Sequence, residues 1–527
     1  MAKKSSSWWI SPGVLIGSTV VVCVGLYLTI TTNTTKDNDI DDELAASIWL
    51  DELDSDPTLY TESSLPAEVD ILIIGAGMSG TSTAYHLSTA NRESFVIDAR
   101  EIAGGATGRN AGMLWPSGKD FELDFENQTA EELKSFVEKN GVDCMLNQGG
   151  GVKLFDIEEK EEYKPKCGEE KIDPVLLLGA SPGYFKYGFQ NKISTSFSPA
   201  KVCRALARAS QPHAKFMSDV KVLRLEAINF GNKSAQQKSR QKVFTNKGII
   251  LAKTVIVATN AWISDILPEY QPFIRAVTNT VLATKEPIPL ELQWKVSGVS
   301  SGRGSSEIYA NSRSDGRLIL GGMRNIVEEQ ERELWDSGES VIDHGKGDAQ
   351  IERKLKEWLK SRFPAVAENA DFDYKWKGLI ASPIDGYPLV GFVPGSRNGE
   401  FRQGVLMCGG LGGHGMPRCF GLAKNIVAIL LEDESGGGEL VQKYCQEKCR
   451  IDRFPILPNS KNMDFMRIVA KALALKAIKT KDGYDASKEI EELRNHEQSK
   501  LKSPFIFKDN RFNCIFMHEM RVQLELR

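Results

Sequence analysis

Residues 69–80 read Val69-Asp70-Ile71-Leu72-Ile73-Ile74-Gly75-Ala76-Gly77-Met78-Ser79-Gly80, a short apolar run that leads directly into three spaced glycines. The run is typical of a buried parallel strand, and the residues that follow have the pattern of a helix. In such a unit the first glycine makes the tight turn, the second lets a pyrophosphate approach the backbone, and the third lets the helix pack on the strand. The helix N-terminus adds N–H groups and a positive dipole end for the phosphate. We therefore predict a dinucleotide cradle built from Gly75, Gly77, Met78, Ser79 and Gly80.

A second strand is predicted at residues 94–97, and it ends at Asp98. A carboxylate at this position can accept hydrogen bonds from a ribose diol, and it would repel the extra phosphate of NADP. The alternative reading is a solvated turn aspartate. The predicted cofactor contacts at this strand end are Asp98, Ala99 and Arg100.

A second glycine-rich segment, residues 104–112, follows the acidic strand end. Such a loop can close over the pyrophosphate and approach an isoalloxazine ring, so it favours FAD over NAD; the alternative is a flexible surface loop. Arg109 could face the pyrophosphate or a substrate carboxylate, and its place in the loop favours the pyrophosphate. The predicted contacts from this segment are Gly105, Ala106, Thr107, Arg109, Asn110, Ala111 and Gly112.

The paired segments VDILIIGAGMSGTSTAYHL and AREIAGGATGRNAG resemble the D-amino-acid oxidase superfamily of FAD-dependent oxidoreductases, which includes glycine oxidase, sarcosine oxidase and gamma-glutamylputrescine oxidase. The resemblance spans about residues 67–435. It implies non-covalent FAD, because residues 378–385 lack the cysteine that ties flavin to the sarcosine-oxidase branch. It also implies a third glycine turn at the pyrimidine edge of the flavin. The further contacts that it implies are Val220, Thr259, Trp262, Gly410, Gly412, Gly413, His414, Gly415 and Met416.

The same resemblance implies oxidation of a small amine or amino acid. A substrate hydride would pass to the flavin, water would hydrolyse the resulting imine, and oxygen would reoxidise the flavin to give peroxide. His414 is the candidate catalytic residue, although packing on the flavin is favoured over proton transfer. A sarcosine-type substrate is not favoured, because Pro417 stands where that branch has a carboxylate-binding lysine. The alternatives are a dehydrogenase that passes electrons to a quinone or protein carrier, and a non-catalytic flavin-bound scaffold.

The predicted fold is an α/β FAD-binding Rossmann-like domain of three layers, interleaved with an α+β substrate domain that has an antiparallel sheet. Strands of that sheet are expected at residues 276–284 and 318–321, and Glu307 and Tyr309 share one face of another strand that could line the substrate pocket. The FAD-binding domain is assigned residues 67–120, 200–275 and 371–435, and the substrate domain residues 121–199 and 276–370.

The chain ends are expected to lie outside these domains. Residues 1–31 contain an uncharged apolar run long enough to cross a bilayer, and Lys3 and Lys4 favour a cytoplasmic N-terminus; a cleaved signal peptide is the alternative. Residues 32–66 are predicted to be an acidic linker, and residues 436–527 a C-terminal extension. The net charge of −4 gives no electrostatic reason to expect nucleic acid as a partner, and the nine cysteines include no CxxC pair that would suggest a metal site.

Overall fold

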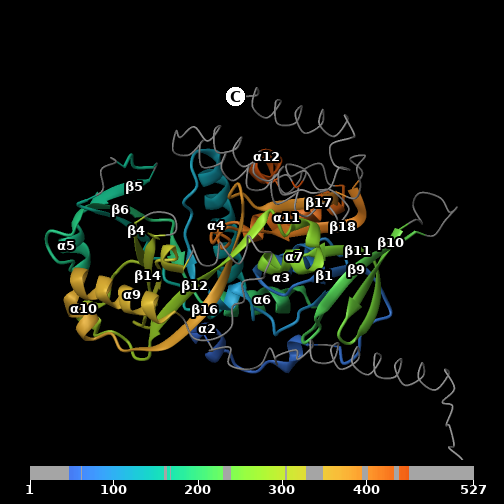
Figure 1. Cartoon of the computed structure of the whole chain (residues 1–527), viewed down its shortest axis with the longest axis horizontal. Coiled ribbons are helices and arrows are strands. Elements are labelled where there is room, and N and C mark those ends of the chain that lie inside the picture. The colour runs from blue at the N-terminus through green and yellow to red at the C-terminus, as the bar shows by residue number, and fades with distance from the viewer. Residues whose placement is uncertain are drawn as a thin grey trace, which may run out of the picture.

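The computed structural model describes residues 47–60, 62–158, 163–166, 168–229, 239–302, 306–327, 348–394, 401–432, 438–449 and 451. Two mixed sheets of eight strands each organise these residues (Figure 1). The chain passes between the two sheets several times, so each half is assembled from separated segments, as the interleaved fold class predicts.

The first sheet carries the strand–turn–helix unit at its centre. Its main strand order is β17 (Leu389–Pro394), β18 (Phe401–Gly409), β11 (Gly248–Val257), β1 (Glu68–Ile74), β2 (Ser94–Ile97) and β8 (Ala214–Met217). β10 (Ser239–Thr245) also pairs with β11, and β9 (Val222–Asn229) pairs with β10. β1 pairs in parallel with both β2 and β11. Because side chains alternate along a strand, Ile71 and Ile73 enter one core while Leu72 and Ile74 enter another.

Helices cover one face of this sheet. α3 (Met78–Thr89) packs between α6 (Pro199–Ser210) and α11 (Cys419–Leu430), while α7 (Ile263–Ile266) contributes to the core on the opposite face. β1 is therefore covered on both faces, which explains why its second half is a continuous apolar run.

The second sheet lies at the other end of the molecule (Figure 1). Its order is β16 (Phe372–Pro383), β12 (Ile274–Thr284), β15 (Leu318–Gly322), β14 (Ile308–Ser312), β13 (Gly298–Ser301), β4 (Gly151–Asp156), β6 (Phe185–Asn191) and β5 (Glu169–Ile172). Its pairs are antiparallel except β13 with β4. The expected strands at residues 276–284 and 318–321 are confirmed as β12 and β15. α9 (Ala349–Arg362) packs on β12 and β15, and with α10 (Pro364–Glu368) it shares an apolar core with this sheet.

Two elements lie in a different half from the one their residue numbers predicted. β16 was expected in the first sheet, but it pairs along its length with β12, because the long antiparallel ladder between them satisfies both backbones. α4 (Phe121–Lys139) was expected in the substrate half, but it packs against α11 and α12 (Glu439–Lys448) through an apolar face that includes Phe125 and Leu133.

The expected acidic linker also ends earlier than predicted. From Ser47 onward it packs on the body of the protein, with α2 (Ile48–Asp51) and a short 3-10 turn at Pro57–Leu59. Ile48, Trp49 and Leu59 are buried, because these apolar side chains enter the same core as α3 and α6.

The helices of the described residues include none with both the length and the apolar character to cross a bilayer. The expected anchor at residues 1–31 lies outside the described residues, as does all of the C-terminal extension after Ile451.

Candidate active site

The first glycine turn has no room for a side chain at Gly75 or Gly80. Gly75 has a φ of +107°, and a Cβ there would lie 2.7 Å from the carbonyl oxygen of Ala258 on the adjacent strand. A Cβ on Gly80 would lie 1.8 Å from the carbonyl oxygen of Gly75. The turn therefore keeps its bare backbone at the N-terminus of α3, as a phosphate-binding cradle requires. The Ser79 hydroxyl donates to the Cys419 sulfur at 3.4 Å, so Ser79 presents its backbone rather than its side chain to a ligand.

The carboxylate of Asp98 lies beside this turn. Its two oxygens accept hydrogen bonds from the backbone N–H groups of Ala76 at 2.6 Å and Arg100 at 2.8 Å. Burial raises the pKa of Asp98, and the two backbone donors oppose that rise. The Val220 N–H donates to the Asp98 carbonyl at 2.8 Å, so the two segments expected near the adenosine are adjacent, while Ala99 is exposed beside them.

The second glycine loop closes onto the first. The Thr107 hydroxyl oxygen accepts a hydrogen bond from the Met78 N–H at 2.9 Å, which joins the 3-10 turn at Ala106–Arg109 to the start of α3. The Asn110 side chain stabilises the loop internally, since it donates to the Thr107 carbonyl and accepts from the Gly112 N–H. Arg109 is buried, and one of its guanidinium nitrogens donates to the carbonyl of Lys377 in β16 at 3.2 Å.

The segment after β11 links the loops to one another. The Trp262 ring lies under the Arg100 guanidinium at 4.8 Å and close to Gly105. The Asn260 side-chain oxygen accepts hydrogen bonds from the Gly410 and Leu411 N–H groups at 3.0 and 3.2 Å. Asn260 was not among the predicted site residues, although its position directly after a buried strand was a usable signal.

The third glycine turn requires backbone angles that favour glycine. Gly410, Gly412 and Gly413 have φ angles of +67°, +63° and +73°, which L side chains rarely adopt. A Cβ on Gly412 would lie at ordinary contact distance, 3.6 Å, from the carbonyl oxygen of Gly386, whereas a Cβ on Gly410 would lie 2.7 Å from the Pro383 ring. Bare backbone in three neighbouring turns, with a carboxylate at the end of β2, fits a flavin adenine dinucleotide.

His414 belongs to a buried ionic cluster that the sequence did not predict. Its Nε2 lies 3.1 Å from the carboxylate of Glu126, a fully buried side chain on α4. Glu126 also accepts from Arg418 Nε at 2.8 Å and from the N–H groups of Ser117 and Gly118 at 2.7 and 2.8 Å. Burial favours a raised pKa, but His414, Arg418 and the backbone donors outweigh it and hold the pKa of Glu126 well below its usual range. The Arg418 side chain is thus directed at Glu126.

Three polar side chains of the second sheet and the segment after β15, Arg324, Tyr309 and Asn279, are here called the polar wall. The Tyr309 hydroxyl accepts a hydrogen bond from Asn279 Nδ2 at 2.5 Å, and burial raises the pKa of Tyr309 to about 12. A Cβ on Gly413 would lie 3.5 Å from a guanidinium nitrogen of Arg324, so the end of β15 meets this turn. Two residues beyond Tyr309 on β14, Asn311 donates to the Ala111 carbonyl of the second loop. Tyr309 was a predicted pocket residue, whereas Arg324 and Asn279 were not.

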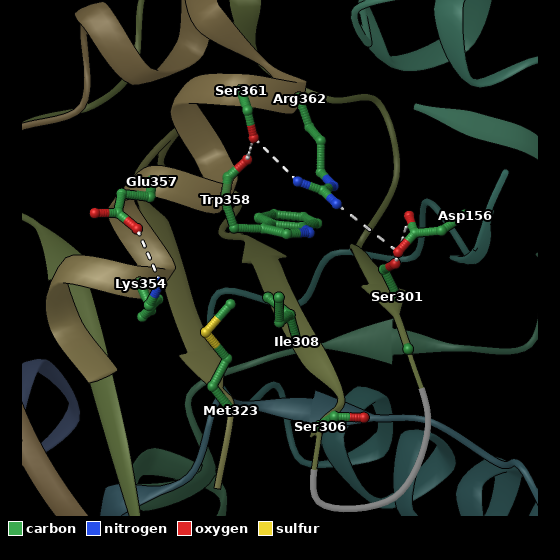
Figure 2. A pocket seen from close by; sticks show the side chains of 11 residues that line it. Asp156, Ser301, Ser306, Ile308, Met323, Lys354, Glu357, Trp358, Ser361 and Arg362 are labelled. Atoms are coloured by element: carbon green, nitrogen blue, oxygen red, sulfur yellow. Dashed lines mark hydrogen bonds and ion pairs between the residues drawn. The ribbon is translucent and has the colours of Figure 1, made fainter. Parts of the chain in front are cut away.

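A separate cavity of about 430 Å³ opens on the other face of the same sheet (Figure 2). Ile308, Met323, Trp358 and Arg362 are among its lining residues, and Asp156 faces Arg362 across it at 3.9 Å. Since Ile308 and Tyr309 are consecutive on β14, they point to opposite faces. The cavity therefore lies behind the polar wall, under α9, and not beside the glycine turns.

Comparisons with known proteins identify the family. The sequence model of the FAD dependent oxidoreductase (DAO) family matches residues 70–429, so the chain belongs to this family and its cofactor is FAD. Its similarity to glycine oxidase of Bacillus licheniformis is 26% identity over 370 residues, which is 64% of this chain and 89% of the relative. Gamma-glutamylputrescine oxidoreductase of Escherichia coli K12 is 25% identical over 69% of this chain and 84% of its own.

Solved structures give the same fold. L-amino acid deaminase from Proteus vulgaris aligns with a TM-score of 0.55 at 18% identity, over 71% of this chain and 93% of that one. Glycine oxidase from Geobacillus kaustophilus aligns with a TM-score of 0.54 at 16% identity, over 70% and 96%. The predicted family and FAD-binding fold are thereby confirmed, and the chain is an FAD-dependent oxidoreductase.

Proposed function

We propose that this protein oxidises an amino acid, and that Arg324 and Tyr309 receive the carboxylate of the substrate. The observation that carries the proposal is the guanidinium of Arg324 at the Gly413 turn, within electrostatic range of Tyr309. Relatives named glycine oxidase and gamma-glutamylputrescine oxidoreductase support the wider class of amines and amino acids.

The guanidinium of Arg324 at the third glycine turn favours an anionic group on the substrate. A guanidinium forms strong charge-assisted hydrogen bonds with a carboxylate. Tyr309 remains a neutral hydroxyl donor across the physiological range, because its pKa is about 12. Asn279 already donates to the Tyr309 oxygen, which leaves the phenolic hydrogen to donate elsewhere.

Each side chain then has a distinct task. When bound, FAD would supply the oxidising chemistry of the reaction as the hydride acceptor. Arg324 and Tyr309 orient the substrate through its carboxylate, so that the C–H bond faces the cofactor. The contact with the Glu126 carboxylate fixes the His414 ring, and His414 in turn orients the third glycine turn. We therefore assign His414 a positioning role rather than proton transfer. The substrate nitrogen reacts as the free amine, and water hydrolyses the imine product.

The test compares each amino acid with the amine that lacks its carboxylate, in the wild type and in Arg324→Met. We expect Arg324→Met to raise KM for the amino acid by about 100-fold, which corresponds to ~3 kcal/mol. KM for the amine should change less than threefold. Arg324→Lys keeps the charge but not the planar fork, and it should recover only part of the loss.

Two outcomes would contradict the carboxylate assignment. One is a wild type that oxidises amines better than the matched amino acids. The other is an equal rise in KM for both members of a pair, because this would indicate general damage to the site. Hydrogen peroxide formed in air, in proportion to substrate consumed, supports oxygen as the electron acceptor; turnover that needs an added quinone supports the dehydrogenase alternative.

A further inference from the structure

Residues 47–60, here called the N-terminal strap, precede the part of the chain that matches the family. They nevertheless belong to the folded body. Trp49 is 1% exposed and Ile48 and Leu59 are fully buried, which is unusual for a segment that begins an acidic, polar stretch of chain. The strap runs along the lower edge of the molecule in Figure 1, where α2 is labelled.

The strap covers the outer side of the second glycine loop. The Ser47 hydroxyl donates to the Gly108 carbonyl, and the Trp49 indole N–H donates to the Asn110 carbonyl at 2.7 Å. A Cβ on Gly108 would lie 2.6 Å from Leu50, and a Cβ on Gly112 would lie 2.6 Å from the Trp49 ring. A side chain at Gly108 or Gly112 would clash with the strap, so both glycines allow the strap to pack closely on this loop.

The strap is also attached to the second sheet. The Glu52 carboxylate accepts from the guanidinium of Arg313 at 2.7 and 3.0 Å and forms an ion pair with Arg317. Arg313 lies over the Trp49 ring at 4.9 Å, so one buried cation connects Glu52 with the indole. Tyr374 on β16 donates its hydroxyl hydrogen to Asp51 at 2.7 Å.

Further along, the strap is held by α6 of the first half. Arg204 donates to the Asp54 carbonyl at 2.5 Å, and Arg208 pairs with the Asp56 carboxylate. The strap therefore contacts the second glycine loop, the second sheet and the helical layer of the first sheet. An arrangement of this kind fixes the loop relative to both halves.

We propose that the N-terminal strap is a cofactor-retaining element of this protein, with Trp49 as the residue that positions the second glycine loop for FAD. The Thr107 hydroxyl oxygen of the loop accepts a hydrogen bond from the Met78 N–H at the start of α3, so displacement of the loop's outer support changes the geometry of the cradle. FAD affinity then depends on a segment that the family match does not include. The inference rests on FAD binding and is independent of the substrate assignment.

The experiment uses the full chain and measures FAD binding to the apoprotein by quenching of flavin fluorescence. Trp49→Ala is expected to raise the Kd for FAD by at least 10-fold and to alter the visible circular dichroism of bound flavin. Trp49→Phe keeps a ring over the loop but lacks the N–H donor, so it should fall between Trp49→Ala and the wild type. Ser47→Ala, a milder change, should raise the Kd two- to fivefold.

The matched control is Leu59→Ala, since Leu59 is as buried as Trp49 but belongs to the turn that packs on α6. It should lower Tm and leave the Kd for FAD within twofold of the wild type at temperatures where both proteins are folded. Equal effects of Trp49→Ala and Leu59→Ala on the Kd would overturn the proposal. An unchanged Kd in Trp49→Ala and Ser47→Ala would overturn it as well.

Discussion

The two sheets present different chemistry to the space beside the third glycine turn. The first sheet offers backbone: Gly75 and Gly77 at one turn and Gly412 at another have no side chains, and their neighbours leave little or no room for one at Gly75 and Gly77. The second sheet and the segment after β15 offer side chains: Tyr309 and Asn279 are joined by a hydrogen bond, and Arg324 lies at the Gly413 turn. Backbone recognition suits a cofactor that every family member shares, whereas side chains can change with the substrate without disturbing the fold.

The largest expected effect separates these two regions. A Cβ on Gly77 would lie 3.1 Å from the Thr107 hydroxyl oxygen, and the φ of Gly77 is an ordinary −81°, so Gly77→Ala should fold. It should bind FAD about 1000-fold more weakly, or ~4 kcal/mol, because the added methyl group occupies the approach of the pyrophosphate. Calorimetric titration of the apoprotein with FAD measures this change.

Gly179→Ala is the control for backbone effects, since a Cβ there meets no atom within 4 Å although its φ is +66°. It should lose about 1 kcal/mol of stability and bind FAD normally. Normal FAD binding by Gly77→Ala would contradict backbone recognition of the cofactor, because it would show that this turn does not need a residue without a side chain.

A smaller effect is expected at the junction of the two regions. Glu126→Gln should lower the free energy of unfolding by about 3 kcal/mol at pH 7, because it leaves Arg418 without its buried partner. The pKa of Glu126 is depressed in the folded state, so its stabilising contribution is present above the ordinary glutamate pKa and declines as the pH falls below it. Urea unfolding should therefore show a difference between wild type and Glu126→Gln that is constant from pH 7 to 5 and narrows below about pH 4.5.

Glu131→Gln is the matched control on the same helix, since Glu131 is mostly exposed and pairs with Lys134. Its effect should stay within about 0.5 kcal/mol at every pH. Similar losses in both variants would show that the buried cluster has no special role.

The smallest expected effect is in the helical layer, far from any ligand. His86 on α3 packs on the Phe420 ring at 4.5 Å, and burial lowers its pKa to about 4. In the unfolded chain His86 has an ordinary pKa of 6.5 and is protonated below that pH, whereas in the folded protein it stays neutral down to about pH 4. The free energy of unfolding therefore falls as the pH drops from 6.5 towards 4. His86→Phe should remove about 2 kcal/mol of this decline in urea unfolding series. A decline of the same steepness in the variant would contradict the assignment.

The arrangement of the glycine-rich segments was largely predictable because its determinants are local. Glycine spacing after β1, the acid at the end of β2 and the glycines of residues 104–112 are each read from a few adjacent residues, and the structure brings them together. Glu126 and Arg324 were not predictable, because their partners His414 and Gly413 are 288 and 89 residues away and no short pattern marks either. The strap was not predicted because its apolar residues Ile48, Trp49 and Leu50 form a run of only three within a largely acidic and polar stretch, and only tertiary packing shows that Trp49 is buried.

The most direct test of the account is an anaerobic absorbance titration of the purified full chain with amino acids and the amines that lack their carboxylates. The account predicts an oxidised FAD spectrum that one amino acid, or a related group of them, bleaches, while the matched amines leave it oxidised. Reduction of the flavin by amines but not by amino acids would contradict the proposal that Arg324 and Tyr309 bind the substrate carboxylate. A flavin that dithionite reduces but no compound bleaches would contradict the catalytic assignment itself.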